Sequence, residues 1–242
     1  MDVLVTGGSR GIGRAIAVRL GADGARVAVN YLRDEQAAAV TCDAVREAGG
    51  EAFPVQGDVR SPVALKGVAA AVVERWGGLD VLVHNAAMGV IRPIDKLRVS
   101  HWDLTLETSL RPFFLLTKLL RPHLREGGSV IGITSLGSRK FTPGYAAMGA
   151  AKAGMEALVR QLAVELAPRV RVNAVCGGLI DTEALQHLHD TERLQAEVGR
   201  MTPLGRIGSP EDIAGVVRFL CSADSGWVNG EVIVADGGLS AL

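Results

Sequence analysis

Tyr145 and Lys152 are the residues whose types and spacing first suggest chemistry. They lie in the stretch 131–156, where small residues and good helix formers predict a helix. At about 100° per residue, the steps from Tyr145 to Lys152 bring both side chains to one face of that helix. A nearby ammonium favours the phenolate, so we expect Lys152 to lower the pKa of Tyr145 and tune it as a proton donor. The alternative is a solvated tyrosine and a surface lysine on an ordinary amphipathic helix.

A glycine-rich turn near the start of the chain predicts a nucleotide site. An apolar run at residues 3–6 predicts a strand, and an Ala/Ile/Leu pattern to about residue 23 predicts a helix. Glycines between them let the backbone approach a pyrophosphate, and the helix start offers free N–H groups and the positive end of its dipole. The turn contains Gly7, Gly8, Ser9, Arg10, Gly11, Ile12 and Gly13.

The second predicted strand, residues 26–30, bears on the choice of cofactor. In NAD-selective enzymes an acid near the end of this strand binds the ribose hydroxyls, but here the chain continues with Tyr31, Leu32 and Arg33. The fixed guanidinium donors of Arg33 and Arg10 suit a 2′-phosphate, so NADPH is the expected cofactor. The alternative for either arginine is a surface charge.

The remaining elements alternate along the chain. Further strands are expected at 51–55, 79–83, 128–134, 170–175 and 231–235. Further helices are expected at 34–49, from Ser61 and Pro62, at 100–125 with a bend at Pro112, from Tyr145 to about 167, and from a capping box at Ser209 to 221. This alternation predicts an α/β fold, a three-layer doubly wound parallel sheet of the Rossmann type with about seven strands, in one domain over residues 1–242. The small, polar and leucine residues at 179–205 predict a mobile lid over substrate.

Ligands of such sheets bind beyond the carboxyl ends of the strands. Residues expected at these ends are Gly7, Asp58, Asn85, Ser135 and Gly178. Asp58 is a candidate partner for an adenine amino group, and Asn85 can hold backbone groups of neighbouring strands. Ala86 and Ala87 leave room for a nicotinamide ribose. Ser135 has two open interpretations, orienting substrate or capping its own loop.

Composition excludes several function classes. The 242 residues carry no net charge and intersperse acids with bases, so there is no electrostatic footprint for nucleic acid or an anionic membrane, and a small-molecule partner is expected. Three cysteines without a CxxC pair and five histidines without metal-ligand spacing (His84, His101, His123, His187 and His189) argue against disulfide and metal sites. No export signal or membrane-spanning run is recognised, which favours the cytoplasm.

Several motifs in order make the chain resemble a short-chain dehydrogenase/reductase over nearly its whole length. These are residues 6–13, Asp58 and Val59, Asn85 and Ala86, Ser135, Tyr145, Lys152, residues 173–175, Thr182, residues 203–206 and residues 236–238. The resemblance implies that Lys152 binds the nicotinamide ribose, that Thr182 anchors the carboxamide, and that the protein is a homotetramer. Cofactor-binding residues expected on this basis are Gly7, Ser9, Arg10, Gly11, Ile12, Gly13, Arg33, Asp58, Val59, Asn85, Ala86, Lys152, Gly178 and Thr182.

The chain departs from the family pattern at the tyrosine. Most members have Tyr-x-x-x-Lys, but here Met148 stands four residues before Lys152 and Tyr145 lies three residues further upstream. Ser109 stands where the family usually has an active-site Asn, Ala87 replaces a glycine, and Gly177 a proline. Tyr-x6-Lys resembles the divergent enoyl-acyl-carrier-protein reductases, and the fit is closest to the NADPH-dependent type III enzymes of fatty acid synthesis.

The displaced phenol also has a physical rationale. In ketone reduction the oxygen to be protonated is on the carbon that takes the hydride, whereas in enoyl-thioester reduction the charge appears on a carbonyl oxygen two carbons away. Three residues of helix shift a side chain by about 4.5 Å, in the sense needed to follow that oxygen. We therefore expect an NADPH-dependent reductase of a trans-2-enoyl thioester, carried by acyl carrier protein or coenzyme A.

The expected catalytic residues are Tyr145, Lys152 and Ser135, and Met148, Ala87 and Ser109 are expected in the substrate pocket. Packing in the core is the alternative role for Met148. Two other functions stay open at this point: a 3-oxoacyl or other carbonyl reductase, and a catalytically silent NADP-binding protein, which Ser109 would favour.

Overall fold

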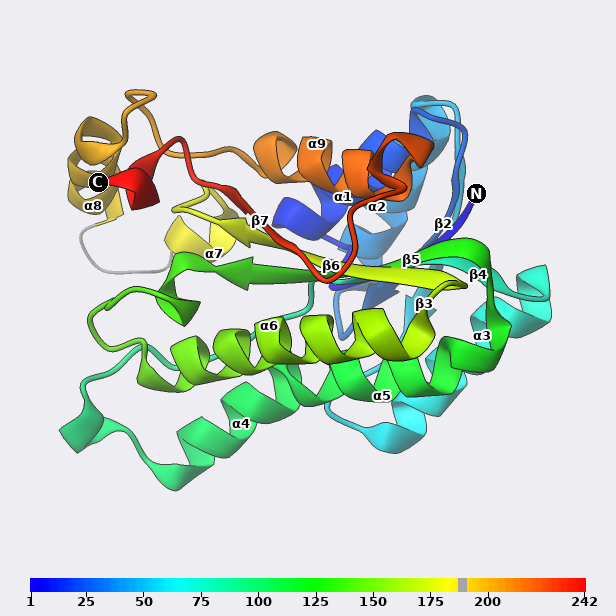
Figure 1. Cartoon of the computed structure of the whole chain (residues 1–242), viewed down its shortest axis with the longest axis horizontal. Coiled ribbons are helices and arrows are strands. Elements are labelled where there is room, and N and C mark those ends of the chain that lie inside the picture. The colour runs from blue at the N-terminus through cyan, green and yellow to red at the C-terminus, as the bar shows by residue number, and fades with distance from the viewer. Residues whose placement is uncertain (187–190) are drawn as a thin grey trace.

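The computed structural model describes residues 1–186 and 191–242, and within them one parallel sheet forms the middle of the molecule (Figure 1). Its seven strands run in the order β3-β2-β1-β4-β5-β6-β7. Their bounds are β1 Asp2–Thr6, β2 Arg26–Tyr31, β3 Glu51–Gln56, β4 Leu79–His84, β5 Leu124–Ser135, β6 Val170–Gly177 and β7 Val232–Ala235. The fold class and the number of strands expected from the sequence are confirmed. The order reverses between β1 and β4, where doubly wound folds bind their ligands.

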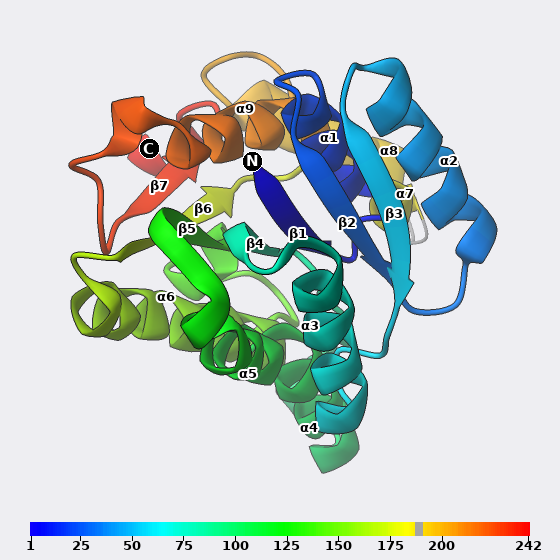
Figure 2. The same ribbon diagram turned by 90° about the vertical axis from the view of Figure 1, so that its right-hand side faces the viewer.

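Helices cover both faces of the sheet and complete three layers (Figures 1 and 2). One face carries α1 Gly11–Gly21, α2 Glu35–Glu47 and α9 Pro210–Cys221, and the other carries α3 Pro62–Trp76, α4 Val99–Ser109, α5 Arg111–Leu120 and α6 Ala146–Leu166. Successive strand residues point to opposite faces, so Val3 and Val5 pack in the core under α1, whereas Leu4 packs in the core under α3, α5 and α6. Both faces are buried, which explains the near-continuous apolar runs of the strands.

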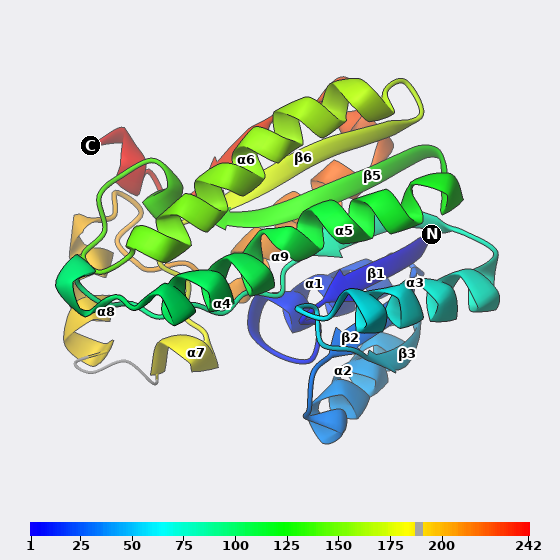
Figure 3. The same cartoon turned by 90° about the horizontal axis from the view of Figure 1, so that it is seen from below.

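The helix expected at 100–125 is two helices. α4 ends at Ser109 and α5 begins at Arg111, with Pro112 in its first turn. A proline ring clashes with the carbonyl four residues earlier, so the chain restarts a helix at Pro112 instead of bending one. In Figure 3 the two helices follow one another beside α6. α5 ends at Leu120, and β5 begins at Leu124, earlier than expected.

Two helix starts are as the sequence predicts. The Ser61 hydroxyl accepts the Ala64 N–H at 3.2 Å before α3, and the Asp212 carboxylate accepts the Ser209 N–H at 2.7 Å before α9. The expected lid contains α7 Glu183–Gln186 and α8 Thr191–Met201, and part of it, residues 187–190, lies outside the described residues. No helix within the described residues is both long and apolar enough to span a membrane.

Candidate active site

A cleft of about 320 Å³ opens at the carboxyl ends of β1 to β4. Most of the residues expected to bind a cofactor line it, namely Gly7, Ser9, Arg10, Gly11, Ile12, Asp58, Val59, Asn85, Ala86 and Thr182, together with Ala87. Thr182 comes from the segment after β6 and lies close to the glycine turn, since a Cβ on Gly11 would be 3.6 Å from its methyl group. The cleft therefore joins segments from both halves of the chain.

The glycine turn has the geometry that a dinucleotide requires. Gly7 has φ +60° and Gly11 has φ +53°, a region that favours glycine, and a Cβ on Gly7 would lie 3.0 Å from the Ala86 backbone. A Cβ on Gly13 would lie 2.2 Å from the Gly7 carbonyl oxygen. Gly13 thus lets α1 pack on the turn and does not line the cleft. Bare backbone at this helix start fits the pyrophosphate of a nicotinamide cofactor.

Two amide side chains, of Asn85 and Asn30, hold the turn in place. The Asn85 side chain donates to the Thr6 and Gly7 carbonyl oxygens at 3.1 and 3.0 Å, as expected. Asn30 was not among the predicted site residues. It is fully buried in β2 and donates to the carbonyl oxygens of Val55 and Gly57. The signal in the sequence was a polar residue inside an apolar strand, because a buried amide needs partners.

Arginines surround Asp58, the expected adenine partner. Arg60 forms an ion pair with Asp58 at 2.7 Å, and its hydrogen bonds hold the pKa of that carboxyl below its usual range. Arg33 is near enough to act on the same carboxylate, although it does not line the cleft. Arg60 does line the cleft and was missed, because a lone arginine after a strand has no motif of its own. Arg10 and Arg60, which both line the cleft, are candidate cations for a phosphate.

Tyr145 lies just before α6 and not within it. It is the N-terminal cap residue, and its carbonyl oxygen accepts the first helical hydrogen bond from Gly149 at 2.6 Å. Its hydroxyl lies 3.3 Å from the Ser135 hydroxyl oxygen at the end of β5, so two of the three expected catalytic residues meet. Burial raises the pKa of Tyr145, and the hydrogen bond with Ser135 opposes this. The expectation that Lys152 would lower this pKa is wrong, because burial dominates and no effect of Lys152 is found.

Lys152 is buried on α6, about two helical turns after Tyr145. Its ammonium donates to the Ile133 carbonyl oxygen at 2.7 Å, and burial lowers its pKa to about 8. Burial disfavours the charged form, so this lysine is poised between its two protonation states in mildly alkaline solution. This bond holds Lys152 against β5, two residues before Ser135, the last residue of the strand.

Three other expected site residues have structural contacts. The Ser109 hydroxyl is fully buried and bonds the backbone of Met88 at 3.2 and 3.3 Å, which ties the segment after β4 to the end of α4. Met148 is buried and packs on Gly89, where a Cβ would come within 2.5 Å of its terminal methyl. Gly178 bonds β7 through its N–H and lines a separate pocket with Asp236.

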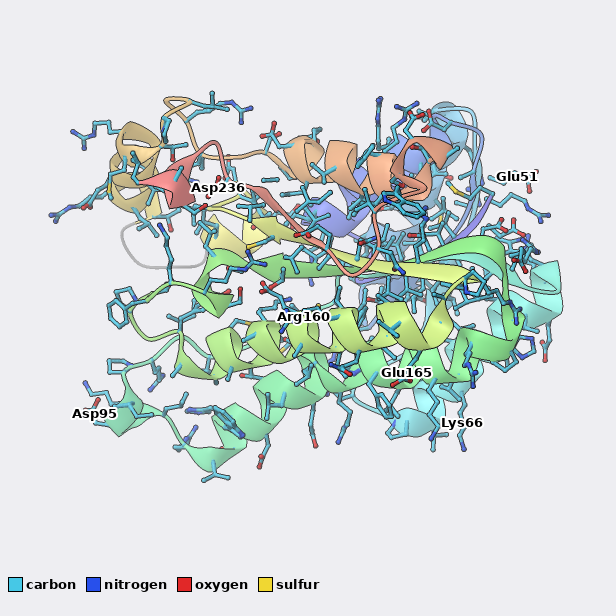
Figure 4. All side chains as sticks on the ribbon, viewed as in Figure 1. Glu51, Lys66, Asp95, Arg160, Glu165 and Asp236 are labelled. Carbon is cyan, nitrogen blue, oxygen red and sulfur yellow. The ribbon has the colours of Figure 1, made fainter. Side chains whose placement is uncertain are left out.

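A second pocket of about 550 Å³ lies beside Tyr145. The side chains of Ile94, Phe141 and Pro143 supply apolar surface, and Arg92 and Lys140 supply cations. The Arg92 N–H donates to the Gly144 carbonyl oxygen at 2.9 Å, which joins the two loops around the pocket. Asp95, which follows the pocket residue Ile94, lies at the same end of the molecule as Asp236 (Figure 4). Sequence reasoning missed this pocket because it forms between two loops.

No group of histidine, cysteine and carboxylate side chains suited to a metal occurs within residues 1–186 and 191–242. His187 and His189 lie outside these described residues. His84 is fully buried, its Nδ1 lies 3.0 Å from the Thr6 hydroxyl oxygen, and burial lowers its pKa to about 3.

The fold and the cleft define a dinucleotide-binding protein. A family model described as enoyl-(acyl carrier protein) reductase matches residues 7–240. A 1-cyclohexenylcarbonyl-CoA reductase of Streptomyces collinus is 38% identical over 99% of this chain and 86% of its own length. A 3beta-hydroxysteroid dehydrogenase of Eggerthella lenta is 34% identical over 98% and 93%. A short-chain dehydrogenase of Burkholderia cenocepacia, solved in complex with NADP, is 33% identical over 98% and 97%, with a TM-score of 0.91.

The chain belongs to the short-chain dehydrogenase/reductase family, as its motifs indicate. It is an NAD(P)-dependent oxidoreductase of that family.

Proposed function

We propose that this protein reduces the carbon–carbon double bond of a trans-2-enoyl thioester with NADPH. The observation that carries the proposal is the position of the phenol: Tyr145 meets Ser135 from outside α6, while Met148 fills the position four residues before Lys152. The family model and the Streptomyces relative support it, since the name of that relative denotes an α,β-unsaturated thioester.

The cofactor would lie along the glycine turn, with Asp58 and Val59 near the adenine, Lys152 at the ribose and Thr182 at the carboxamide. When bound, NADPH supplies a hydride. Hydride addition at the β-carbon moves the π electrons toward the thioester and leaves an enolate, whose oxygen Tyr145 stabilises by donating a hydrogen bond or proton. A proton taken from solvent water then forms the C–H bond at the α-carbon, which completes the saturated thioester. The raised pKa of Tyr145 keeps its proton in place at neutral pH.

The pocket beside Tyr145 supports an acyl thioester as substrate. Phe141 and Ile94 are 91% and 77% exposed, and they offer apolar contact to an acyl chain. Arg92 and Lys140 border the same space and provide cations for the phosphate of a coenzyme A or carrier-protein arm. The carrier and the chain length are part of the proposal to be tested.

Tyr145→Phe tests the proposal, because it removes only the hydroxyl. We expect turnover with crotonyl-CoA, followed by NADPH absorbance, to fall by about 10²–10³-fold, the usual cost of one oxyanion donor. NADPH affinity, measured by fluorescence titration, should stay the same. Ser222→Ala, which also removes a single hydroxyl, is the control, because Ser222 lines neither the cleft nor the pocket beside Tyr145. Full turnover in Tyr145→Phe would contradict the assigned role.

A carbonyl reductase is the second candidate. The Eggerthella relative, a hydroxysteroid dehydrogenase by name, favours it. The two candidates differ in substrate preference: enoyl reduction predicts NADPH oxidation with crotonyl-CoA and little with acetoacetyl-CoA, and carbonyl reduction predicts the reverse. Tight NADPH binding without turnover of either thioester would instead indicate a silent NADP-binding protein.

A further inference from the structure

The ring of Tyr145 lies against a glycine of the turn that follows β5. A Cβ on Gly137 would come within 2.3 and 2.4 Å of two ring carbons of Tyr145. A Cβ on Gly149, in the first turns of α6, would lie 2.6 Å from the Gly137 carbonyl oxygen. Neither glycine has a positive φ, so each position requires the lack of a side chain and not a special backbone conformation. The two glycines form a slot that the phenol ring fills.

One carboxylate holds the turn that carries Gly137, the 3₁₀ turn η3 Leu136–Ser138. The side chain of Glu156 on α6 is 7% exposed. Its Oε1 accepts from Ser138 at 2.6 Å and from Thr134 at 3.1 Å, and its Oε2 accepts from Arg139 at 2.9 Å. A buried carboxylate without donors costs several kcal/mol, so these three partners and the carboxylate fix each other.

Glu156 follows Lys152 by one helical turn and therefore lies on the same face of α6. Lys152 bonds the Ile133 carbonyl oxygen, and Glu156 bonds the next residue, Thr134, and the turn beyond it. This face of α6 is therefore bonded to Ile133 and Thr134, just before Ser135, and to Ser138, just after it. The Ser138 hydroxyl also lies 2.7 Å from the Ser135 carbonyl oxygen.

We propose that Glu156 and Gly137 are positioning residues that place the Tyr145 hydroxyl beside Ser135. Glu156 fixes the turn, the turn presents Gly137, and Gly137 sets the depth at which the ring lies. The inference rests on the proposed function in that the hydroxyl is the group that acts on substrate. The positioning itself is a geometric statement, and it can be measured without substrate.

Gly137→Ala and Glu156→Gln test the proposal. The added Cβ must displace the ring, so we expect Gly137→Ala to lower kcat with crotonyl-CoA by about 10²-fold, close to the loss of the donor itself. Glu156→Gln loses the charge that faces Arg139, and we expect kcat to fall by about tenfold. In both variants the KM for NADPH should change less than twofold. The controls are Gly67→Ala on α3, where a Cβ meets nothing within 4 Å, and Glu165→Gln on the exposed side of α6 (Figure 4).

Combination with Tyr145→Phe separates positioning from general stability. If Gly137 and Glu156 act through the hydroxyl, then either substitution should reduce kcat less than threefold further once the hydroxyl is absent. Equal losses in the wild-type and Tyr145→Phe backgrounds would overturn the proposal.

Ionisation of the phenol gives a readout that needs no catalysis. The chain has two tyrosines, so in Tyr31→Phe protein the absorbance of phenolate reports on Tyr145 alone. Displacement of the ring from its half-buried slot should lower the titration midpoint toward that of free tyrosine in Gly137→Ala and Glu156→Gln, and Gly67→Ala should not change it. Unchanged midpoints in both variants would overturn the positioning role. If the wild-type protein did not reduce crotonyl-CoA but the titration midpoints still shifted in the variants, only the proposed function would be overturned.

Discussion

The chemistry of this site depends on how one phenol and one ammonium are buried. The spacing of Tyr145 and Lys152 is visible in the sequence, but their surroundings are not. Tyr145 lies outside the helix and bonds Ser135, and Lys152 bonds a strand carbonyl behind it. Burial disfavours the charged form of both groups, so it raises the pKa of the phenol and lowers that of the ammonium, and the two pKa values move apart.

The lysine gives a pH-dependent prediction for stability. The pKa of Lys152 is about 8 in the folded protein and about 10.4 in an unfolded chain, so between these values the unfolded chain binds more protons and the contribution of Lys152 to stability rises with pH. Lys152→Met removes this contribution. We expect the stability of Lys152→Met relative to wild type to fall by on the order of 2 kcal/mol between pH 7 and pH 10.

Urea unfolding of both proteins at the two pH values measures this difference. Lys140→Met is the control, because Lys140 is exposed. A difference between Lys152→Met and wild type that does not change with pH would contradict the lowered pKa.

At the scale of elements, we expect the ends of β1, β2 and β3 to determine the choice of cofactor. Arg10 lies in the turn after β1, Arg33 follows β2, and Arg60 follows β3. No acid occupies the end of β2, where Tyr31 stands. Three separate turns therefore bring cations to the region where a 2′-phosphate would bind.

Arg10→Ala combined with Arg33→Ala should weaken NADPH binding far more than NADH binding. Loss of hydrogen bonds from charged groups costs about 1.5–3 kcal/mol each, so we expect a loss of at least 100-fold for NADPH and less than fivefold for NADH. Fluorescence titration of the two cofactors measures the ratio. Arg19→Ala, at the far end of α1, is the control. Equal losses for both cofactors would show that neither arginine meets the phosphate.

Most elements were predictable because each has a local signal. The buried strands are apolar runs, and Ser61 and Ser209 cap their helices as expected. The break at Pro112 was placed correctly but interpreted as a bend, since the sequence does not show whether the flanking helices share an axis. Arg60 and the pocket beside Phe141 were missed because they depend on how separate loops meet, and no local pattern encodes that.

At the scale of the whole molecule, the sheet order explains how the site assembles. Gly7, Asn85 and Ser135 are far apart in sequence but end the neighbouring strands β1, β4 and β5. The motifs and the doubly wound topology together predicted that these residues lie at one edge of the sheet. The outer surface of α4, α5 and α6 was not predicted in detail. Figure 3 shows these three helices on one side of the sheet. Trp102 on α4, Phe114 on α5 and Val164 on α6 are exposed.

This apolar surface leads us to expect self-association, in line with the homotetramer that the family resemblance implies. Val164→Glu should lower the oligomeric state, measured by sedimentation velocity, because a charge there would be buried on association. Val63→Glu on α3 is a matched control, since both valines are 79% exposed. A monomeric wild-type protein, or an equal effect of Val63→Glu, would contradict the assignment of this surface.

The contact between Met148 and Gly89 limits how this enzyme could be redesigned. A tyrosine at position 148 would restore the commoner arrangement of phenol and lysine, but the methionine already reaches the backbone at Gly89. The longer ring would push aside the segment that begins at Met88, which borders the nucleotide cleft. Moving the phenol to the commoner position therefore requires a rebuilt loop after β4 as well as a substituted side chain.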